Sequence, residues 1–201
     1  MASPKKVISP SSIGHFGLRT RPENFDAMVK WHLAFFGGRI VLQNPHAAFI
    51  AFDEEHHRLV IVQDPTHVNV PDKRKAASIY HIAFTLDSLA DLADKYEEIK
   101  AVGIEPHWPV NHGMSTSMYY FDPDGNEFEF QVDNFDTGAE ALAFMETEEY
   151  RRNPIGVDID LEDWLRRVRS GEDEKTLKKR PDIGQRLSRW ENSIYFKEPP
   201  Q

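Results

Sequence analysis

An internal repeat constrains this chain more than any other feature of its sequence. The strand-like segment Ile13-Gly-His-Phe-Gly-Leu-Arg19 reappears as Ile79-Tyr-His-Ile-Ala-Phe-Thr85, and its histidine moves from position 15 to position 81, a shift of 66 residues. Each copy leads into a segment whose apolar residues recur at helical spacing. We therefore expect two copies of one structural module.

Each module is predicted to have the element order β-α-β-β-β. The first helix should begin near Pro22 and end before Gly37, and the second should begin near Ser88 and end at Gly103. The strands that follow are predicted at 39–43, 47–52 and 58–63 in the first module, and at 104–110, 115–121 and 127–132 in the second. The modules span about 11–64 and 78–133, with a polar linker between them.

The predicted fold class is α+β, with the two βαβββ modules paired into a partly closed barrel over residues 11–135 and the helices outside. The interior of such a barrel is a natural place for a small molecule. Residues 136–201 lie beyond the repeat and are predicted to form a helical and irregular C-terminal extension, with helices at 137–148 and 161–170.

The extension contains more apolar residues than a solvated tail needs. We expect some of them to pack on the barrel or to bridge a homodimer. They are Leu142, Phe144, Tyr150, Leu161, Trp164, Leu165, Trp190, Tyr195 and Phe196.

Charge and composition exclude several classes of protein. The net charge of −9 argues against binding to nucleic acids or to anionic membranes. Without cysteine there can be no disulfide, thiolate metal site or cysteine nucleophile, so a transition metal would have to be held by His, Asp and Glu. No secretory signal or membrane-spanning run is apparent, and a cytoplasmic protein is expected.

Three residues at related places in the repeat suggest a metal site. His15 and His81 occupy the same place on the first strand of each module, and Glu129 lies on a polar face of the last strand together with Glu127 and Gln131. Two histidines and one carboxylate on one side of Fe(II) leave positions open for substrate and O₂. Taken singly, each histidine could instead be structural, and Glu129 could be solvated.

The first module is expected to lack a fourth ligand. Alignment of the module endings on Gln63 and Gln131 places Ile61 opposite Glu129, where a four-ligand isomerase site would need a carboxylate. Three ligands favour chemistry that requires open metal positions. The other histidines are expected to be structural or solvated; they are His32, His46, His67 and His107, with His56 at the surface.

These motifs resemble those of one enzyme family. The motifs are Gly14-His15, Glu55-His-His-Arg-Leu-Val-Ile61, Ile79-Tyr-His81 and Tyr119-Tyr-Phe-Asp-Pro-Asp-Gly-Asn-Glu-Phe-Glu129. Over residues 11–133 the chain resembles the type I extradiol dioxygenases of the vicinal-oxygen-chelate superfamily, in particular the single-domain members similar to 2,3-dihydroxybiphenyl 1,2-dioxygenase.

The resemblance implies a site and a reaction. His15, His81 and Glu129 would bind Fe(II), or Mn(II) or another divalent metal, with O₂ as co-substrate and a catechol-type aromatic as substrate. His57 would be an acid/base beside the metal, and Tyr119 would bond a substrate hydroxyl.

One position departs from the family pattern. Two-domain members have a further active-site histidine nine residues before the tyrosine, where this chain has Val110. His112, seven residues before Tyr119, would serve in its place if the loop is two residues shorter.

Two other functions remain open from the sequence. One is a metal-dependent isomerase or lyase of the glyoxalase type, which would consume no O₂ with any catechol. The other is a ligand-binding module with the same fold and no catalysis, which would retain no metal.

Overall fold

The computed structural model of the protein describes residues 8–70 and 73–197. The chain divides into two compact units, Met1–Pro71 and Asp72–Gln201. Each unit contains one copy of the repeat, and the two are described separately.

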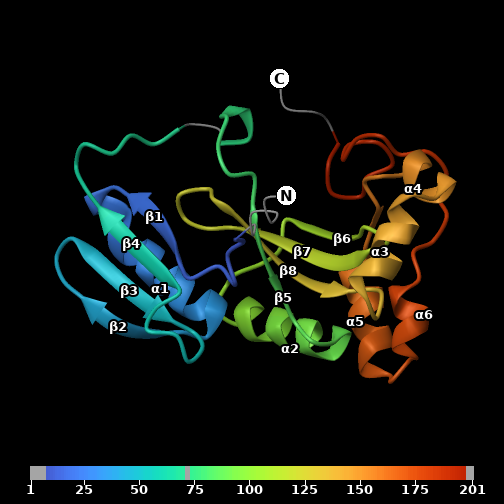
Figure 1. Ribbon diagram of the computed structural model, residues 1–201, viewed down its shortest axis with the longest axis horizontal. Helices are drawn as coiled ribbons and strands as arrows, with labels where there is room; N and C mark the ends of the chain where they lie inside the picture. Colours follow the sequence, from blue (N-terminus) through green and yellow to red (C-terminus); the bar gives the residue numbers. More distant parts are fainter. Residues whose placement is uncertain (1–7, 71–72, 198–201) are drawn as a thin grey trace, which may run out of the picture. The chain divides into compact units, whose positions relative to one another are not determined.

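The first unit has the predicted order of elements (Figure 1). A short 3-10 helix, Pro22–Asn24, leads directly into the only α-helix among the described residues of this unit. The elements are β1 (Phe16–Thr20), α1 (Phe25–Phe36), β2 (Arg39–Gln43), β3 (Ala47–Ala51) and β4 (Leu59–Gln63). The sheet has the order β1-β4-β3-β2, in which β1 is parallel to β4 and the other neighbours are antiparallel.

Helix α1 forms because its apolar residues fall on one side at helical spacing, and this side covers the sheet. Phe25, Met28 and Val29 are buried against strands β3 and β4, whose core residues are Ala48, Ile50, Leu59 and Ile61. The helix ends at Gly37, which has a φ of 62° that favours glycine.

The second unit repeats this pattern. Its elements are β5 (Ile82–Thr85), α2 (Leu89–Lys100), β6 (Trp108–Asn111), β7 (Ser115–Phe121) and β8 (Glu127–Asp133), preceded by a short 3-10 helix at Lys73–Lys75. The sheet has the order β5-β8-β7-β6-β9, with β5 parallel to β8. Both βαβββ modules and the α+β class are therefore confirmed. In the described residues neither sheet closes on itself. The pairing of the modules into a barrel stays a prediction.

Helix α2 shows why one predicted strand is shorter than expected. The Ser88 hydroxyl accepts from the Asp91 amide and caps the start of the helix. At the other end the Ile104 amide donates to the Ile99 carbonyl, so Ile104 belongs to the helix terminus. The strand predicted at 104–110 accordingly begins only at Trp108.

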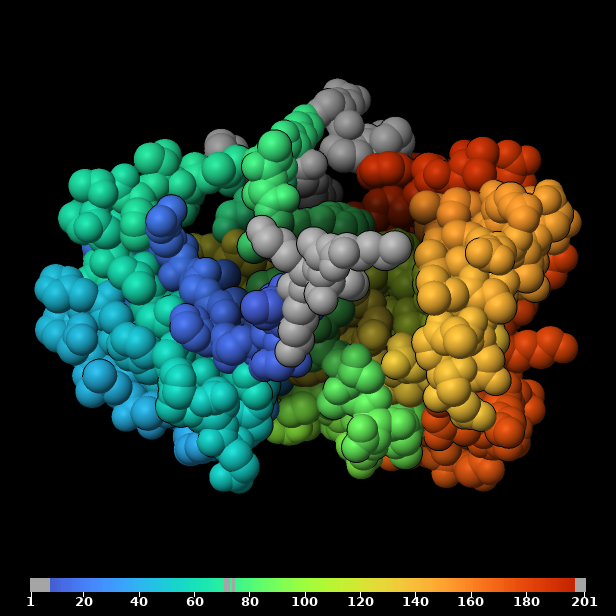
Figure 2. All heavy atoms as spheres, viewed as in Figure 1, coloured from blue at the N-terminus to red at the C-terminus, as the bar shows by residue number. Residues whose placement is uncertain are grey.

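The C-terminal extension belongs to the second unit and covers one end of its module (Figure 2, orange to red). In place of the single helix predicted at 137–148 there are two shorter helices, α3 (Gly138–Met145) and α4 (Glu148–Arg152). The Thr147 side chain accepts from the Tyr150 amide and so caps the start of the second one. They are followed by β9 (Val157–Asp158), α5 (Leu161–Arg169) and α6 (Glu174–Lys178).

The extension packs on the second module, as expected. Strand β9 pairs antiparallel with β6, and Arg169 of α5 forms an ion pair with Asp94 of α2 at 2.6 Å. Trp164 is buried, whereas Leu142 is 65% exposed and is therefore not among the residues that pack. Among the described residues, none of the helices has the length and hydropathy needed to cross a bilayer.

Candidate active site

The backbone beside His15 is held by Arg58. His15 lies one residue before β1, and His81 lies one residue before β5, so the two histidines occupy equivalent places in the modules. The Arg58 guanidinium donates to the carbonyls of Ile13 and Gly14, both at 2.8 Å. The segment that leads to His15 is therefore fixed to the start of β4.

His57 lies next to His15 within the first unit. The two ring centroids are 4.4 Å apart, and Phe49 meets the His57 ring edge-on at 5.2 Å. Nδ1 of His57 is 2.6 Å from Nδ1 of His56, whose own side chain is 71% exposed, as expected for a surface residue. Burial, helped by the charges of His15 and His56, lowers the pKa of His57 below its ordinary value, so the ring is neutral near pH 7.

Strand register corrects the predicted alignment of the two modules by one residue. In the first sheet Gly17 pairs with Val60, and in the second Ala83, the equivalent of Gly17, pairs with Glu129. Val60 thus occupies the place of Glu129, while Ile61 faces the α1 core. The place of a fourth ligand still holds an apolar side chain.

His81 and Glu129 form a close pair in the second unit. Nε2 of His81 is 3.0 Å from Oε2 of Glu129, and Nδ1 of His81 is buried with no hydrogen-bond partner in the described part of the chain. Glu129 is only 3% exposed, which excludes a solvated glutamate. Burial alone would raise the pKa of Glu129, but hydrogen bonds from His81 and Ser117 outweigh it and lower that pKa.

Tyr119 lies beside this pair. It is directly opposite Glu129 in the pairing of β7 with β8, and its ring is 5.2 Å from that of His81. The Trp108 ring stacks on the Tyr119 ring, with centroids 5.1 Å apart. Burial and the negative charge of Glu129 raise the pKa of Tyr119 far above its ordinary value, so the hydroxyl keeps its proton.

His112 reaches Tyr119, although it stands outside β6. Its Nε2 is 3.0 Å from the Tyr119 hydroxyl. Val110, at the family position of the missing histidine, is fully buried in a small apolar cluster together with Trp108 and Tyr119. The structure therefore places a histidine next to Tyr119 from a position two residues later in the chain.

Some neighbours of the site were not predicted from the sequence. Ser117 and Trp108 were missed, although Ser117 could have been found because it shares an alternating strand face with Tyr119. His107, expected to be structural or solvated, lies 2.9 Å from the buried carboxylate of Glu127 and stacks on Phe121. The Glu127 carboxylate is therefore already engaged by a protein side chain.

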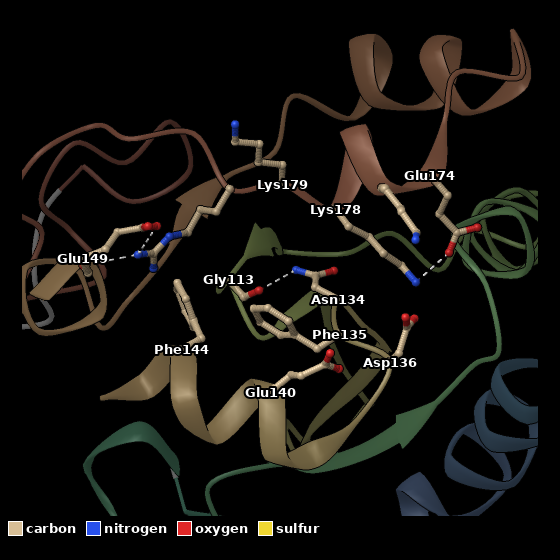
Figure 3. Close-up of a pocket in the computed structure, with 12 residues that line it drawn as sticks. Gly113, Asn134, Phe135, Asp136, Glu140, Phe144, Glu149, Glu174, Lys178 and Lys179 are labelled. Carbon is tan, nitrogen blue, oxygen red and sulfur yellow. Dashed lines mark hydrogen bonds and ion pairs between the residues drawn. The ribbon is translucent and has the colours of Figure 1, made fainter. Parts of the chain in front are cut away.

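A separate cavity of about 640 Å³ lies between α3, α6 and the end of β8 (Figure 3). None of the six predicted site residues lines it. Its wall includes Gly113 and Arg180, which adjoin His112. Phe135 and Phe144 form its apolar side, and Lys178 pairs with Glu174 across its edge at 2.7 Å.

The six predicted residues fall into two local groups. His15 and His57 are together in the first unit, and His81, Glu129, Tyr119 and His112 are together in the second. Over the described residues, neither unit by itself gathers three His, Asp or Glu side chains that could hold a metal ion.

Comparison with known proteins gives consistent matches. Residues 12–130 match the family described as the Glyoxalase/Bleomycin resistance protein/Dioxygenase superfamily. Biphenyl-2,3-diol 1,2-dioxygenase 2 of Rhodococcus globerulus is 45% identical over 154 residues, which cover 77% of this chain and 80% of that protein. Biphenyl-2,3-diol 1,2-dioxygenase 3 of the same organism is 42% identical, over 72% of this chain and 75% of that protein.

A solved structure shows the same fold. The glyoxylase/bleomycin resistance protein/dioxygenase domain from a Frankia species matches with a TM-score of 0.51 and 15% identity. The match covers 62% of this chain and 99% of that one.

Proposed function

Because this chain belongs to the Glyoxalase/Bleomycin resistance protein/Dioxygenase superfamily and, within it, is an extradiol ring-cleaving dioxygenase, we propose that it opens a catechol-type ring with a divalent metal held by His15, His81 and Glu129. The observation that carries this proposal is the close contact of His81 with the buried Glu129 beside Tyr119. The names of the Rhodococcus relatives favour a diol with a large aromatic substituent as substrate.

The donor atoms fit a divalent transition metal. A carboxylate and an imidazole nitrogen face each other at 3.0 Å, and the second ring nitrogen of His81 is buried without a partner in the described residues. With His15 from the first unit, two histidines and one carboxylate are the set typical of Fe(II) oxygenases. We therefore propose Fe(II) as the metal. When bound, it would offer open positions to the diol oxygens and O₂ and adjust the charge on both.

The chain's own residues would then orient the substrate and move a proton. The Tyr119 hydroxyl stays protonated at neutral pH and lies where it can hydrogen-bond a substrate oxygen. His57 is neutral near pH 7, and its Nε2 makes no hydrogen bond within the described residues. This nitrogen can accept a proton from the diol and return it later, which is the work of a general acid/base.

Anaerobic loading with Fe(II), followed by a panel of catechols, tests the proposal. The expected result is metal bound in proportion to protein, O₂ uptake and a coloured ring-opened product. Larger aryl-substituted diols should be preferred over catechol itself. Retained metal with no O₂ uptake on any diol would favour an isomerase or lyase, and failure to retain metal would favour a ligand-binding module.

A further inference from the structure

The two ring nitrogens of His112 have different partners, and this determines where its proton lies. Nδ1 faces the backbone carbonyl of Ile155, and Nε2 faces the Tyr119 hydroxyl at 3.0 Å. A carbonyl oxygen can only accept, so Nδ1 must carry the hydrogen. Burial lowers the pKa of His112, so the ring is neutral. Its Nε2 therefore carries no hydrogen and can accept one from the Tyr119 hydroxyl.

The Ile155 carbonyl is presented by a tightly bonded turn of the extension. The Asn153 side chain closes this turn, because its Nδ2 donates to the Gly156 carbonyl at 3.1 Å and its Oδ1 accepts from the Gly156 amide at 2.7 Å. Gly156 has a φ of 112°, and a Cβ there would lie 2.4 Å from the Asn111 carbonyl oxygen. Only glycine lets the extension approach the backbone next to His112 this closely.

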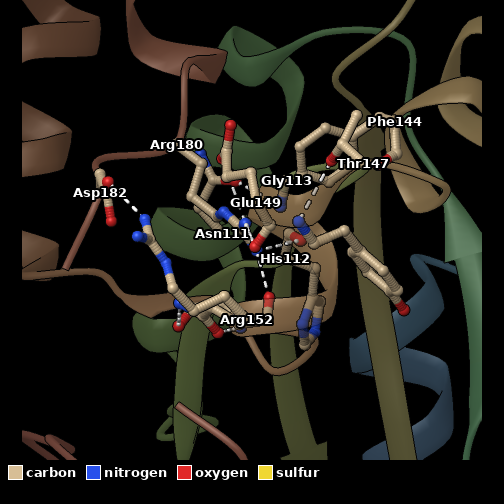
Figure 4. Close-up of polar contacts among 12 residues, drawn as sticks. Asn111, His112, Gly113, Phe144, Thr147, Glu149, Arg152, Arg180 and Asp182 are labelled. Carbon is tan, nitrogen blue, oxygen red and sulfur yellow. Dashed lines mark hydrogen bonds and ion pairs between the residues drawn. The ribbon is translucent and has the colours of Figure 1, made fainter. Parts of the chain in front are cut away.

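Arg180 contacts the segment that contains His112 (Figure 4), and it also contacts this turn. Its side chain is only 3% exposed. One terminal nitrogen, Nη1, donates to the carbonyls of both His112 and Asn153, at 3.1 and 2.7 Å, while Nη2 pairs with Glu149 of α4 at 3.1 Å. A single buried guanidinium thus holds both sides of the His112–Ile155 contact.

Building on the proposed function, we propose that the C-terminal extension, through Arg180 and the Ile155 carbonyl, holds His112 as its Nδ1–H tautomer and so makes it a positioning residue for Tyr119. Nε2 then acts only as an acceptor.

This arrangement decides the role of the Tyr119 oxygen. Because Nε2 of His112 can only accept, the Tyr119 hydroxyl must be the donor in the hydrogen bond between them, and its own lone pairs stay free to accept a hydrogen bond from a substrate hydroxyl. If His112 carried its proton on Nε2, that proton would occupy one of these lone pairs. The extension would therefore act on the reaction through the direction of one hydrogen bond.

The first test is a nitrogen-15 spectrum of the histidine side chains in the full-length protein. The His112 signals can be assigned as those that disappear in His112→Gln. We expect Nδ1 to appear as a protonated nitrogen and Nε2 as an unprotonated one. In Arg180→Met a mixture of both tautomers is expected. A wild-type ring protonated at Nε2 would overturn the proposal, whether or not any variant folds.

The second test is steady-state kinetics on the Fe(II)-loaded enzyme. Arg180→Met should lower kcat by up to about 100-fold, as expected for a misplaced active-site group, at unchanged metal content. Arg180→Lys, which keeps a donor, should recover part of the loss. The matched control is Arg169→Met, which removes another arginine that ties the extension to the module, but through Asp94 of α2 and not through the His112 segment.

The outcomes separate this inference from the proposed function. An equal loss of kcat in Arg169→Met and Arg180→Met, or a wild-type spectrum and kcat in Arg180→Met, would contradict a positioning role. If the wild-type enzyme cleaves no diol, the proposed function fails, but the spectra still decide the tautomer and its dependence on Arg180.

Discussion

His57 and the adjacent His56 have different surroundings. It contacts His15 and Phe49, and its pKa is lowered, whereas His56 is exposed. Replacement of His57 by Gln should leave iron content and substrate affinity largely intact but lower kcat by roughly 10²–10⁴-fold, because an amide cannot exchange a proton near neutral pH. Measurement of kcat over pH and of bound iron checks this.

His56→Gln is the matched control for that experiment, since it changes the adjacent histidine and its contact with Nδ1 of His57 but keeps the His57 ring and its contact with His15. Its rate should stay close to that of the wild type. Lost iron in His57→Gln would make His57 a ligand, and an unaltered rate would make it structural.

Two carboxylates on the same face of β8 allow a sharp test of the metal site. Glu129 pairs with His81, and Glu127 pairs with His107. Glu129→Gln should lower metal affinity by more than the roughly 10–100-fold typical of an outer-shell partner, and turnover should be lost with it. Glu127→Gln should retain the metal. Titration of both variants with Fe(II) measures the difference, and full iron content in Glu129→Gln would refute the ligand assignment.

At the scale of an element, β9 brings the most buried ion pair of the described residues into the second sheet. Asp158 and Arg186 are 2.8 Å apart, with side chains 2% and 0% exposed. Burial opposes ionisation of Asp158, but hydrogen bonds from Arg186, Ser193 and Trp108 outweigh it and lower the pKa of Asp158. The charged carboxylate therefore favours the folded state.

This pair predicts how stability depends on pH. Because the folded-state pKa of Asp158 lies below its unfolded value of about 3.9, its contribution is fully present above that pH. It is lost as the pH falls through the folded-state value. Asp158→Asn should cost about 3–5 kcal/mol at pH 7, since it leaves a buried charge unpaired. Urea unfolding of the wild type and the variant at pH 7 and pH 3 measures the difference in their free energies of unfolding. This difference should be smaller at pH 3, and an equal difference at both pH values would contradict the prediction.

At the scale of the whole molecule, the extension is part of the second unit. It supplies strand β9 at the edge of the sheet, and Tyr195 and Phe196 pack on the cluster formed by Trp108, Val110 and Tyr119. A chain that ends near residue 135 should therefore have a lower melting temperature and expose apolar surface next to Tyr119. Thermal unfolding and light scattering measure this. Unchanged solubility, oligomeric state and melting temperature would show that the extension is dispensable.

Much of the fold was predictable because its signals are local. Helical spacing in α1 and α2 and the sequence repeat determined both modules, and the predicted strands 39–43 and 115–121 match β2 and β7 to the residue. The alignment of Ile61 with Glu129 was wrong by one position. An alignment made only from the similar sequences at the ends of β4 and β8 can be wrong by one residue. The hydrogen-bonded pairing of β4 with β1 and of β8 with β5 fixes the register of both strands.

The sequence by itself determined which residue types are available for the site: histidines at equivalent places in the repeat, a glutamate on the last strand, and no cysteine. Only the tertiary structure decided what His112 does. Its partners Ile155 and Arg180 are 43 and 68 residues away in the chain, and both contacts involve backbone carbonyls. Every residue has such a carbonyl, so no pattern of side chains can reveal which one will face a given histidine.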